Sequence, residues 1–206
     1  MVRIKQRFER PRVVDVAATV RTELEKLDLR PLIRAGQSVA LTAGSRGIAN
    51  IPLILRSVAE HLKRLGGRPF IVPAMGSHAG GSAEGQKRLL ESYGITEEYV
   101  GVPIRASMDV VSLGETQEGY PVVLDRFAAE ADHIGVVARI KAHTGYHGPI
   151  ESGLLKMVMI GLGKHIGARD YLLVMSRCVA PGVLCCKRFG TGQVDVGAGD
   201  QLMLST

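Results

Sequence analysis

Short apolar runs and longer segments with helical periodicity alternate along the chain. Three short and largely apolar runs predict buried strands: Ser38–Thr42, Phe70–Ala74 and His133–Ala138. Ile51–Leu65 follows the first run and carries its apolar residues on one face, with Asn50 as a candidate N-cap. Ala83–Tyr93 follows the second run and begins after Ser82, another residue type that favours helix N-termini. The repeated order of strand, loop and helix predicts an α/β fold.

Further patterns extend this prediction over the rest of the chain. Val13–Leu27 mixes apolar and charged residues at helical spacing, and Ile150–Ile160 after the third strand does so again. Other short elements are expected before the third strand: strands at Val102–Ile104, Met108–Leu113 and Tyr120–Leu124, and a helix at Arg126–Ala131. We therefore expect a mostly parallel, Rossmann-like sheet with helices on both faces over residues 1–170. Tyr171–Thr206 has no sustained helical period, which predicts an atypical C-terminal tail over residues 171–206.

The composition limits the partners of the chain. The formal net charge is +6 and the pI about 9.4, but only 4% of the residues are aromatic and there is no Trp. Because few rings are present for base stacking, an anionic small molecule explains the charge better than nucleic acid does. The three cysteines form no CxxC pair, and no apolar run reaches membrane-spanning length. We expect a cytoplasmic protein with reduced thiols that binds neither nucleic acid nor membranes.

The segment after the third predicted strand concentrates polar side chains. His143 and His147 are spaced i, i+4 and Glu151 follows at i+8, which would align three metal ligands on a helix. The intervening glycines and proline disfavour a continuous helix, so a metal site and a solvent-facing loop both stay open. Lys156 lies among apolar residues, where its amine either reaches solvent or serves as a nucleophile. Lys164 is expected near the same site, although no P-loop pattern surrounds it.

Met75–Ser82, the loop after the second predicted strand, is rich in glycine and holds another histidine. Its glycines allow backbone amides to approach an anion. His78 in this loop is a candidate general acid or base. Arg46, in the loop after the first strand, is a candidate partner for a substrate carboxylate. Because loops at the carboxyl ends of parallel strands lie at one edge of the sheet, we expect these residues near His143.

Three segments taken together resemble the lactate racemase family: TAGSRGI, PAMGSHAGGSAEGQ and ARIKAHTGYHGPIESGLLKMVMIGLGKHIGA. The resemblance covers about residues 10 to 170, which correspond to the N-terminal domain of that family. It implies an isomerase that racemises a small 2-hydroxy acid by reversible hydride transfer. It also implies a nickel-pincer nucleotide, a cofactor in which an organic group derived from nicotinic acid nucleotide holds nickel and is often tethered to a lysine.

The resemblance further implies roles for individual residues. His78 and His143 would be the paired acid/base groups, Arg46 the partner of the substrate carboxylate, and Lys156 the tether or contact of the cofactor. The backbone of the glycine-rich loop would contact the cofactor phosphate through Gly76, Ser77, Gly80 and Gly81. His165 is the candidate nickel ligand.

The chain departs from the family pattern at three places. Ala43 stands where the family has an Asp ahead of the arginine, which leaves the identity of the acid open. Tyr171 and Leu172 stand near the place of the expected nickel histidine, with His165 as the nearby substitute. The second domain of the family is not encoded before Thr206, so we expect an incomplete chain. Two alternatives stay open: a non-catalytic nucleotide- or phosphate-binding domain, and a metal hydrolase built on His143, His147 and Glu151.

Overall fold

The computed structural model describes most of the chain from Val13 onward. The described residues are 13–115, 119, 121–139, 153–175, 192–195 and 200–205. His143, His147 and Glu151 lie outside these ranges, as do the three cysteines. The domain boundary expected after residue 170 stays a prediction, and a helix, α7 (Lys164–Met175), continues across it.

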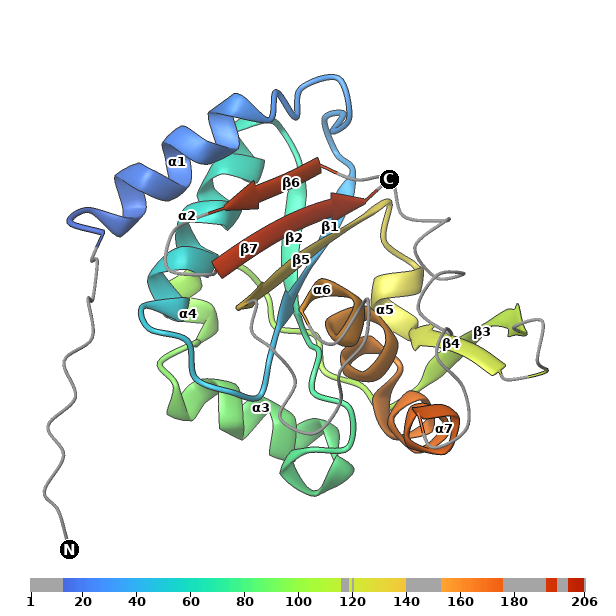
Figure 1. Ribbon diagram of the computed structural model, residues 1–206. Helices are drawn as coiled ribbons and strands as arrows, with labels where there is room; N and C mark the ends of the chain where they lie inside the picture. Colours follow the sequence, from blue (N-terminus) through green and yellow to red (C-terminus); the bar gives the residue numbers. More distant parts are fainter. Residues whose placement is uncertain are drawn as a thin grey trace, which may run out of the picture.

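Five strands form the main sheet of the described residues, in the order β2-β1-β5-β7-β6 (Figure 1). Their bounds are β1 Ser38–Ala43, β2 Arg68–Pro73, β5 His133–Arg139, β6 Gly192–Asp195 and β7 Asp200–Ser205. β1 pairs in parallel with β2 and with β5, whereas β7 pairs antiparallel with β5 and β6. Almost every residue of β1, β2 and β5 is buried, as apolar strands covered on both faces require. The three buried strands and the α/β class are therefore confirmed.

Helices cover both faces of the parallel strands (Figure 1). Their bounds are α1 Val16–Lys26 and α2 Ile51–Arg64 on one face, and α5 Arg126–Ala129, α6 Leu154–Lys156 and α7 on the other. Two hydrophobic cores result, because successive residues of a strand point to opposite faces. Ile71 packs in the core beneath α1 and α2, while its neighbours Phe70 and Val72 pack with Leu124 and Leu162 in the other core. Helices on both faces, as predicted, are thus confirmed.

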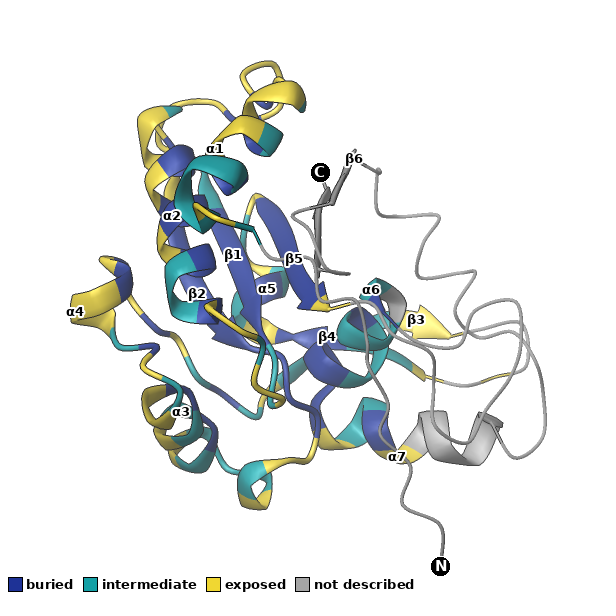
Figure 2. Cartoon of the chain, turned by 60° about the vertical axis from the view of Figure 1, so that its left-hand side comes forward, coloured by how far each residue is buried: buried dark blue, intermediate teal, exposed yellow. Residues whose placement is uncertain are grey.

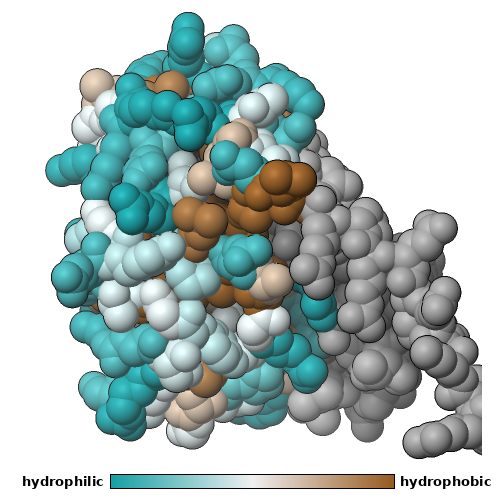
Figure 3. Space-filling view, turned by 90° about the vertical axis from the view of Figure 1, so that its left-hand side faces the viewer, coloured by the Kyte–Doolittle hydropathy of each residue, from teal (hydrophilic) through white to brown (hydrophobic). Residues whose placement is uncertain are grey.

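The outward faces of the helices on the α1 and α2 side are exposed, whereas the strands behind them are buried (Figure 2). Leu55 and Leu62 of α2 are fully buried, as the spacing of its apolar residues predicts. Figure 3 shows that the surface on this side is mostly hydrophilic, with a hydrophobic patch near its centre. In the part of the chain that the structure describes, no helix combines the length and the apolar character needed to cross a membrane.

Side-chain caps begin several of the predicted helices. Ser82 accepts a hydrogen bond from the Gly85 amide at 3.1 Å at the start of α3 (Ala83–Ser92). Asn50 precedes α2 as predicted, but its side chain makes no capping hydrogen bond. Its backbone is left-handed, with φ of 60°, a conformation that asparagine tolerates better than most residues. A further short helix, α4, spans Glu97–Val100.

The segment before β5 forms a hairpin outside the main sheet. β3 (Val110–Glu115) and β4 (Pro121–Asp125) pair antiparallel in a separate two-stranded sheet. The expected strand at Val102–Ile104 is wrong, because only an isolated bridge between Ile104 and Ile71 forms there. Val102 and Ile104 are buried in the core beneath α1 and α2, but they do not form a strand with regular pairing.

The helix expected over Ile150–Ile160 is described from residue 153, and it is not one continuous α-helix. α6 ends at Lys156, a π-helical turn called η2 (Met157–Leu162) follows, and α7 then begins. A Cβ atom at Gly161 would lie 2.7 Å from the carbonyl oxygen of Ala74, which follows β2. This close approach of two backbones is possible only with glycine, and it sets η2 directly against the end of β2.

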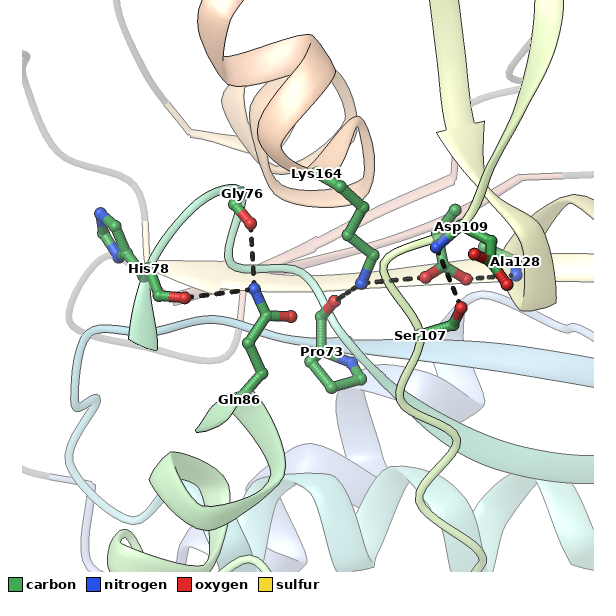
Figure 4. A network of polar contacts seen from close by, with 9 residues as sticks. Pro73, Gly76, His78, Gln86, Ser107, Asp109, Ala128 and Lys164 are labelled. Atoms are coloured by element: carbon green, nitrogen blue, oxygen red, sulfur yellow. Dashed lines mark hydrogen bonds and ion pairs between the residues drawn. The ribbon is translucent and has the colours of Figure 1, made fainter. Parts of the chain in front are cut away.

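Lys164 corrects one expectation, because its side chain is buried away from the predicted site. Its Nζ atom lies 2.9 Å from the carboxylate of Asp125 and donates to the carbonyl of Pro73 at 2.6 Å (Figure 4). Both ionic side chains are fully buried, and the Asp125 carboxylate also accepts from the Ala128 amide at the start of α5. Burial lowers the pKa of Lys164, while the neighbouring carboxylate raises it. Lys164 thus joins α7, α5 and the end of β2.

We expect Lys164→Met to lower the free energy of unfolding by about 3–5 kcal/mol, because it leaves the buried carboxylate of Asp125 without its cation. Denaturant titration measures the change. Lys26→Met is the matched control, since Lys26 pairs with Glu23 at 2.6 Å on an exposed surface and should contribute less than about 1 kcal/mol. The double variant Lys164→Met/Asp125→Asn should recover part of the loss. Equal losses of stability in Lys164→Met and in the control Lys26→Met would contradict this assignment.

Candidate functional site

A pocket of about 280 Å³ lies at the carboxyl ends of the three parallel strands. Residues 44–48 after β1, residues 74, 75, 77 and 78 after β2, and residues 137–139 at the end of β5 line it. Residues of α6, η2 and α7 complete the wall. Ligands of open α/β sheets bind at this edge, because the loops that leave neighbouring strands meet there.

The pocket brings together three side chains that the sequence predicts for the site. Arg46, His78 and Lys156 all line it, although they come from three separate segments. Ser77 lines it too, whereas Gly76, Gly80, Gly81 and His165 are not among the lining residues. His165 is exposed on α7. The role of His143 stays a prediction, because this residue lies outside the described ranges.

The imidazole of His78 is held by a residue of the neighbouring loop. Its Nδ1 atom lies within hydrogen-bonding distance of the Oγ atom of Ser45. His78 itself is exposed, and Ser45 is half-buried. Because Nδ1 is occupied, Nε2 is the ring nitrogen left to meet a ligand. The loop after β1, with the motif TAGSRGI, and the loop after β2, with the motif PAMGSHAGGSAEGQ, are therefore in direct contact.

The side chain of Gln86, in α3, holds the loop of His78 through hydrogen bonds. Its side chain is fully buried, and its Nε2 atom donates to the carbonyl oxygens of Gly76 at 2.9 Å and of His78 at 3.4 Å (Figure 4). Its Oε1 atom is buried without a hydrogen-bond partner among the described residues. The amide orientation is nevertheless determined, since a flipped amide would set Oε1 against two carbonyl oxygens.

Tyr93, at the end of the same helix, supports the other loop. Its hydroxyl donates to the carbonyl oxygen of Ser45 at 2.6 Å. α3 therefore contacts both loops that meet at His78. Neither Gln86 nor Tyr93 is among the site residues predicted from the sequence. The available signal was a glutamine on the apolar face of α3, four residues before Leu90.

Two backbone amides of the glycine-rich loop are engaged, one with η2 and one within the loop. The Gly76 amide donates to the carbonyl of Gly161 at 3.1 Å, and the Gly81 amide donates to that of His78 at 3.1 Å. At Gly76, where φ is 59°, a Cβ atom would lie 3.1 Å from the Ile160 side chain. Gly76 thus allows the close packing of η2 on this loop. Contacts of Gly76, Ser77, Gly80 and Gly81 with a phosphate stay a prediction.

Arg46 is exposed at the mouth of the pocket and makes no ion pair with any described residue. At its neighbour Gly47, no atom outside the adjacent residues lies within 4 Å of the place that a Cβ atom would take, so the loop has open space there. Such a guanidinium can bind a carboxylate or a phosphate through two parallel hydrogen bonds. Together with the Lys156 amine, it gives the pocket cationic groups that suit an anionic ligand.

The comparison with protein families identifies the domain. A model of the lactate racemase N-terminal domain matches residues 6–166. The chain belongs to this family. The match includes β1, β2, β5 and all the described residues that line the pocket except Ala168. A search of curated proteins found no match.

No group of three or more His, Cys, Asp or Glu side chains is placed to hold a metal ion within the ranges that the structure describes. The alternative site built on His143, His147 and Glu151 is not addressed by this finding, since all three residues lie outside those ranges. The metal-hydrolase alternative accordingly stays a prediction.

We expect Gln86→Glu to lower the free energy of unfolding by about 3 kcal/mol or more near neutral pH, because a buried carboxylate would face two carbonyl oxygens. Burial raises the pKa of such a carboxyl above its unfolded value of about 4.3. The unfolded chain then binds fewer protons than the folded chain, so stability falls as the pH rises from about 4.3 to the folded pKa.

Urea titrations between pH 4 and pH 8 measure this difference from the wild type. Arg88→Glu, at an exposed position of the same helix, is the control and should show neither the loss nor its pH dependence. A Gln86→Glu variant as stable as the wild type at pH 8 would contradict the buried contact.

Proposed function

We propose that the chain acts in the racemisation or epimerisation of a small 2-hydroxy acid, with a nickel-pincer nucleotide as cofactor. The observation that carries this proposal is the convergence of Arg46, His78 and Lys156 on one pocket in a member of the lactate racemase N-terminal domain family. The resemblance implies a role for nine residues, and these three and Ser77 are the ones among them that line the pocket. A cytoplasmic location is part of the same proposal.

The charge of the pocket supports binding of the organic part of this cofactor, and the pocket volume lies just below the usual range for ligand pockets. The exposed Arg46 guanidinium and the Lys156 amine are cationic groups for a phosphate-bearing molecule. The open space beside Gly47 leaves room for it, and about 280 Å³ is close to the lower end of the range of about 300–1,000 Å³ typical of ligand pockets. Lys156 would tether the cofactor, whereas His165, the nickel ligand that the resemblance implies, does not line the pocket.

The residues of the chain would perform binding and proton transfer. When bound, the cofactor supplies a site that accepts a hydride from the substrate carbon and returns it. Arg46 would hold the substrate carboxylate and so orient the hydroxyl group toward His78. His78 would accept the hydroxyl proton at Nε2 and later return it, and His143 would do the same from the other side.

The proposal predicts that Lys156 carries the cofactor. We expect the full chain, produced with nickel in a host that makes the pincer nucleotide, to gain covalent mass and to retain nickel. Lys156→Met should abolish the mass increase, because the tethering amine is gone, while the exposed control Lys26→Met should retain it. Intact-mass spectrometry measures the adduct and metal analysis measures the nickel. Chiral assays on a panel of 2-hydroxy acids that includes lactate and malate measure racemisation.

The metal content separates the alternatives. Nickel with a covalent adduct supports the racemase proposal. Zinc alone would favour a hydrolase, and neither metal nor adduct would favour a phosphate-binding domain. The last two results would contradict the racemase proposal.

Arg46→Gln should weaken binding of a 2-hydroxy acid by about 10- to 100-fold, since charged hydrogen bonds contribute about 1.5–3 kcal/mol. Calorimetric titration of the cofactor-loaded chain with lactate measures this loss. Arg34→Gln changes an exposed arginine outside the pocket and should leave the affinity unchanged. Equal affinity of the Arg46 variant and the wild type would remove Arg46 from the binding site.

A further inference from the structure

We propose that Ser45 is a positioning residue for His78, which holds the imidazole so that Nε2 is the atom that exchanges a proton with the substrate. This inference rests on the proposed function, in which His78 transfers that proton. Neither the sequence motifs nor the family match assigns a role to Ser45.

The geometry points to Ser45 because its hydroxyl occupies one of the two ring nitrogens. The Oγ atom of Ser45 contacts Nδ1 of His78, and both residues line the pocket. An exposed histidine can otherwise rotate about its side-chain torsions and present either nitrogen. A contact at Nδ1 leaves only Nε2 for a ligand and determines which way the ring faces.

Ser45 is itself held in place, which a positioning residue requires. Tyr93 donates its hydroxyl proton to the carbonyl of Ser45 at 2.6 Å, and its ring packs against the core beneath α2. The preceding residue, Gly44, lies against Met157, whose Cε atom would be 3.3 Å from a Cβ atom there. The serine backbone is therefore fixed between α3 and η2, and the orientation of His78 follows from it.

The same contact can persist through the proton transfer. For Nε2 to accept the substrate proton, neutral His78 must carry its hydrogen on Nδ1, and this N–H then donates to Ser45 Oγ. When the substrate hydroxyl loses its proton, the O–H bond breaks and an N–H bond forms at Nε2, while Nδ1–H stays bonded to Ser45. Return of the proton reverses both changes. With His78 in this tautomer, the contact with Ser45 keeps the ring in one orientation in both charge states.

The tautomer of His78 in the full 206-residue chain tests this assignment directly. The chain is labelled with ¹⁵N-histidine and measured with its imidazoles in the neutral form, with His78→Gln used to assign the signals of His78. We expect Nδ1 to be protonated and Nε2 unprotonated in the wild type. Ser45→Ala should lose this pattern in favour of a mixture or of Nε2–H, and Ser45→Thr, which keeps the hydroxyl, should restore it. Thermal unfolding of each variant controls for stability.

Three results decide between this inference and the proposed function. A wild-type His78 protonated at Nε2, or a Ser45→Ala spectrum identical to that of the wild type, would overturn the role of Ser45 whatever the activity. A chain that shows the expected tautomers but racemises no acid would contradict the proposed function and still support the role of Ser45. In an active chain, Ser45→Ala should lower kcat at least about tenfold with KM unchanged, and Ser45→Thr should recover most of it.

Discussion

The parallel pairing of β1 with β2 and β5 is the constraint on which the site depends. In this register Ala43 lies opposite Pro73, and the Ala74 amide donates to the carbonyl of Ala43 at 2.8 Å. The two strands therefore end side by side, and the loops that follow them begin in contact. Because both loops leave from the same edge, Ser45 and His78 meet although they are far apart in the sequence.

Two buried polar side chains help to position the loop that carries His78. Gln86 and Lys164 are both fully buried, and both donate to backbone carbonyls in or before the loop that carries His78. Desolvation of such groups is costly, so they stabilise the fold only with these partners in place. Apolar packing could hold the layers together, but it does not specify loop geometry as closely as hydrogen bonds to named carbonyls do.

Much of the fold could be predicted from the sequence because its strands are compact apolar runs and its helices are amphipathic. The same signals could not place the β3–β4 hairpin, since its half-exposed residues look alike in a central strand and in a separate ribbon. The break of the helix at η2 was missed because it depends on Gly161 packing against Ala74, a contact between distant segments. Arg46, His78 and Lys156 could be predicted because loop polar residues at strand ends favour ligand sites. Lys164 was misplaced because its partner, Asp125, belongs to another element.

The spacing of Gln86 and Tyr93 has a consequence for how this domain can vary. Gln86 belongs to the helix that follows the His78 loop and Tyr93 is its C-cap. They are about two helical turns apart, so they project from the same face. Inserting or deleting a single residue between them would rotate one by about 100° relative to the other and break one of the two contacts. We therefore expect substitutions on the outer side of this helix to affect the two contacts less than a change in its length would.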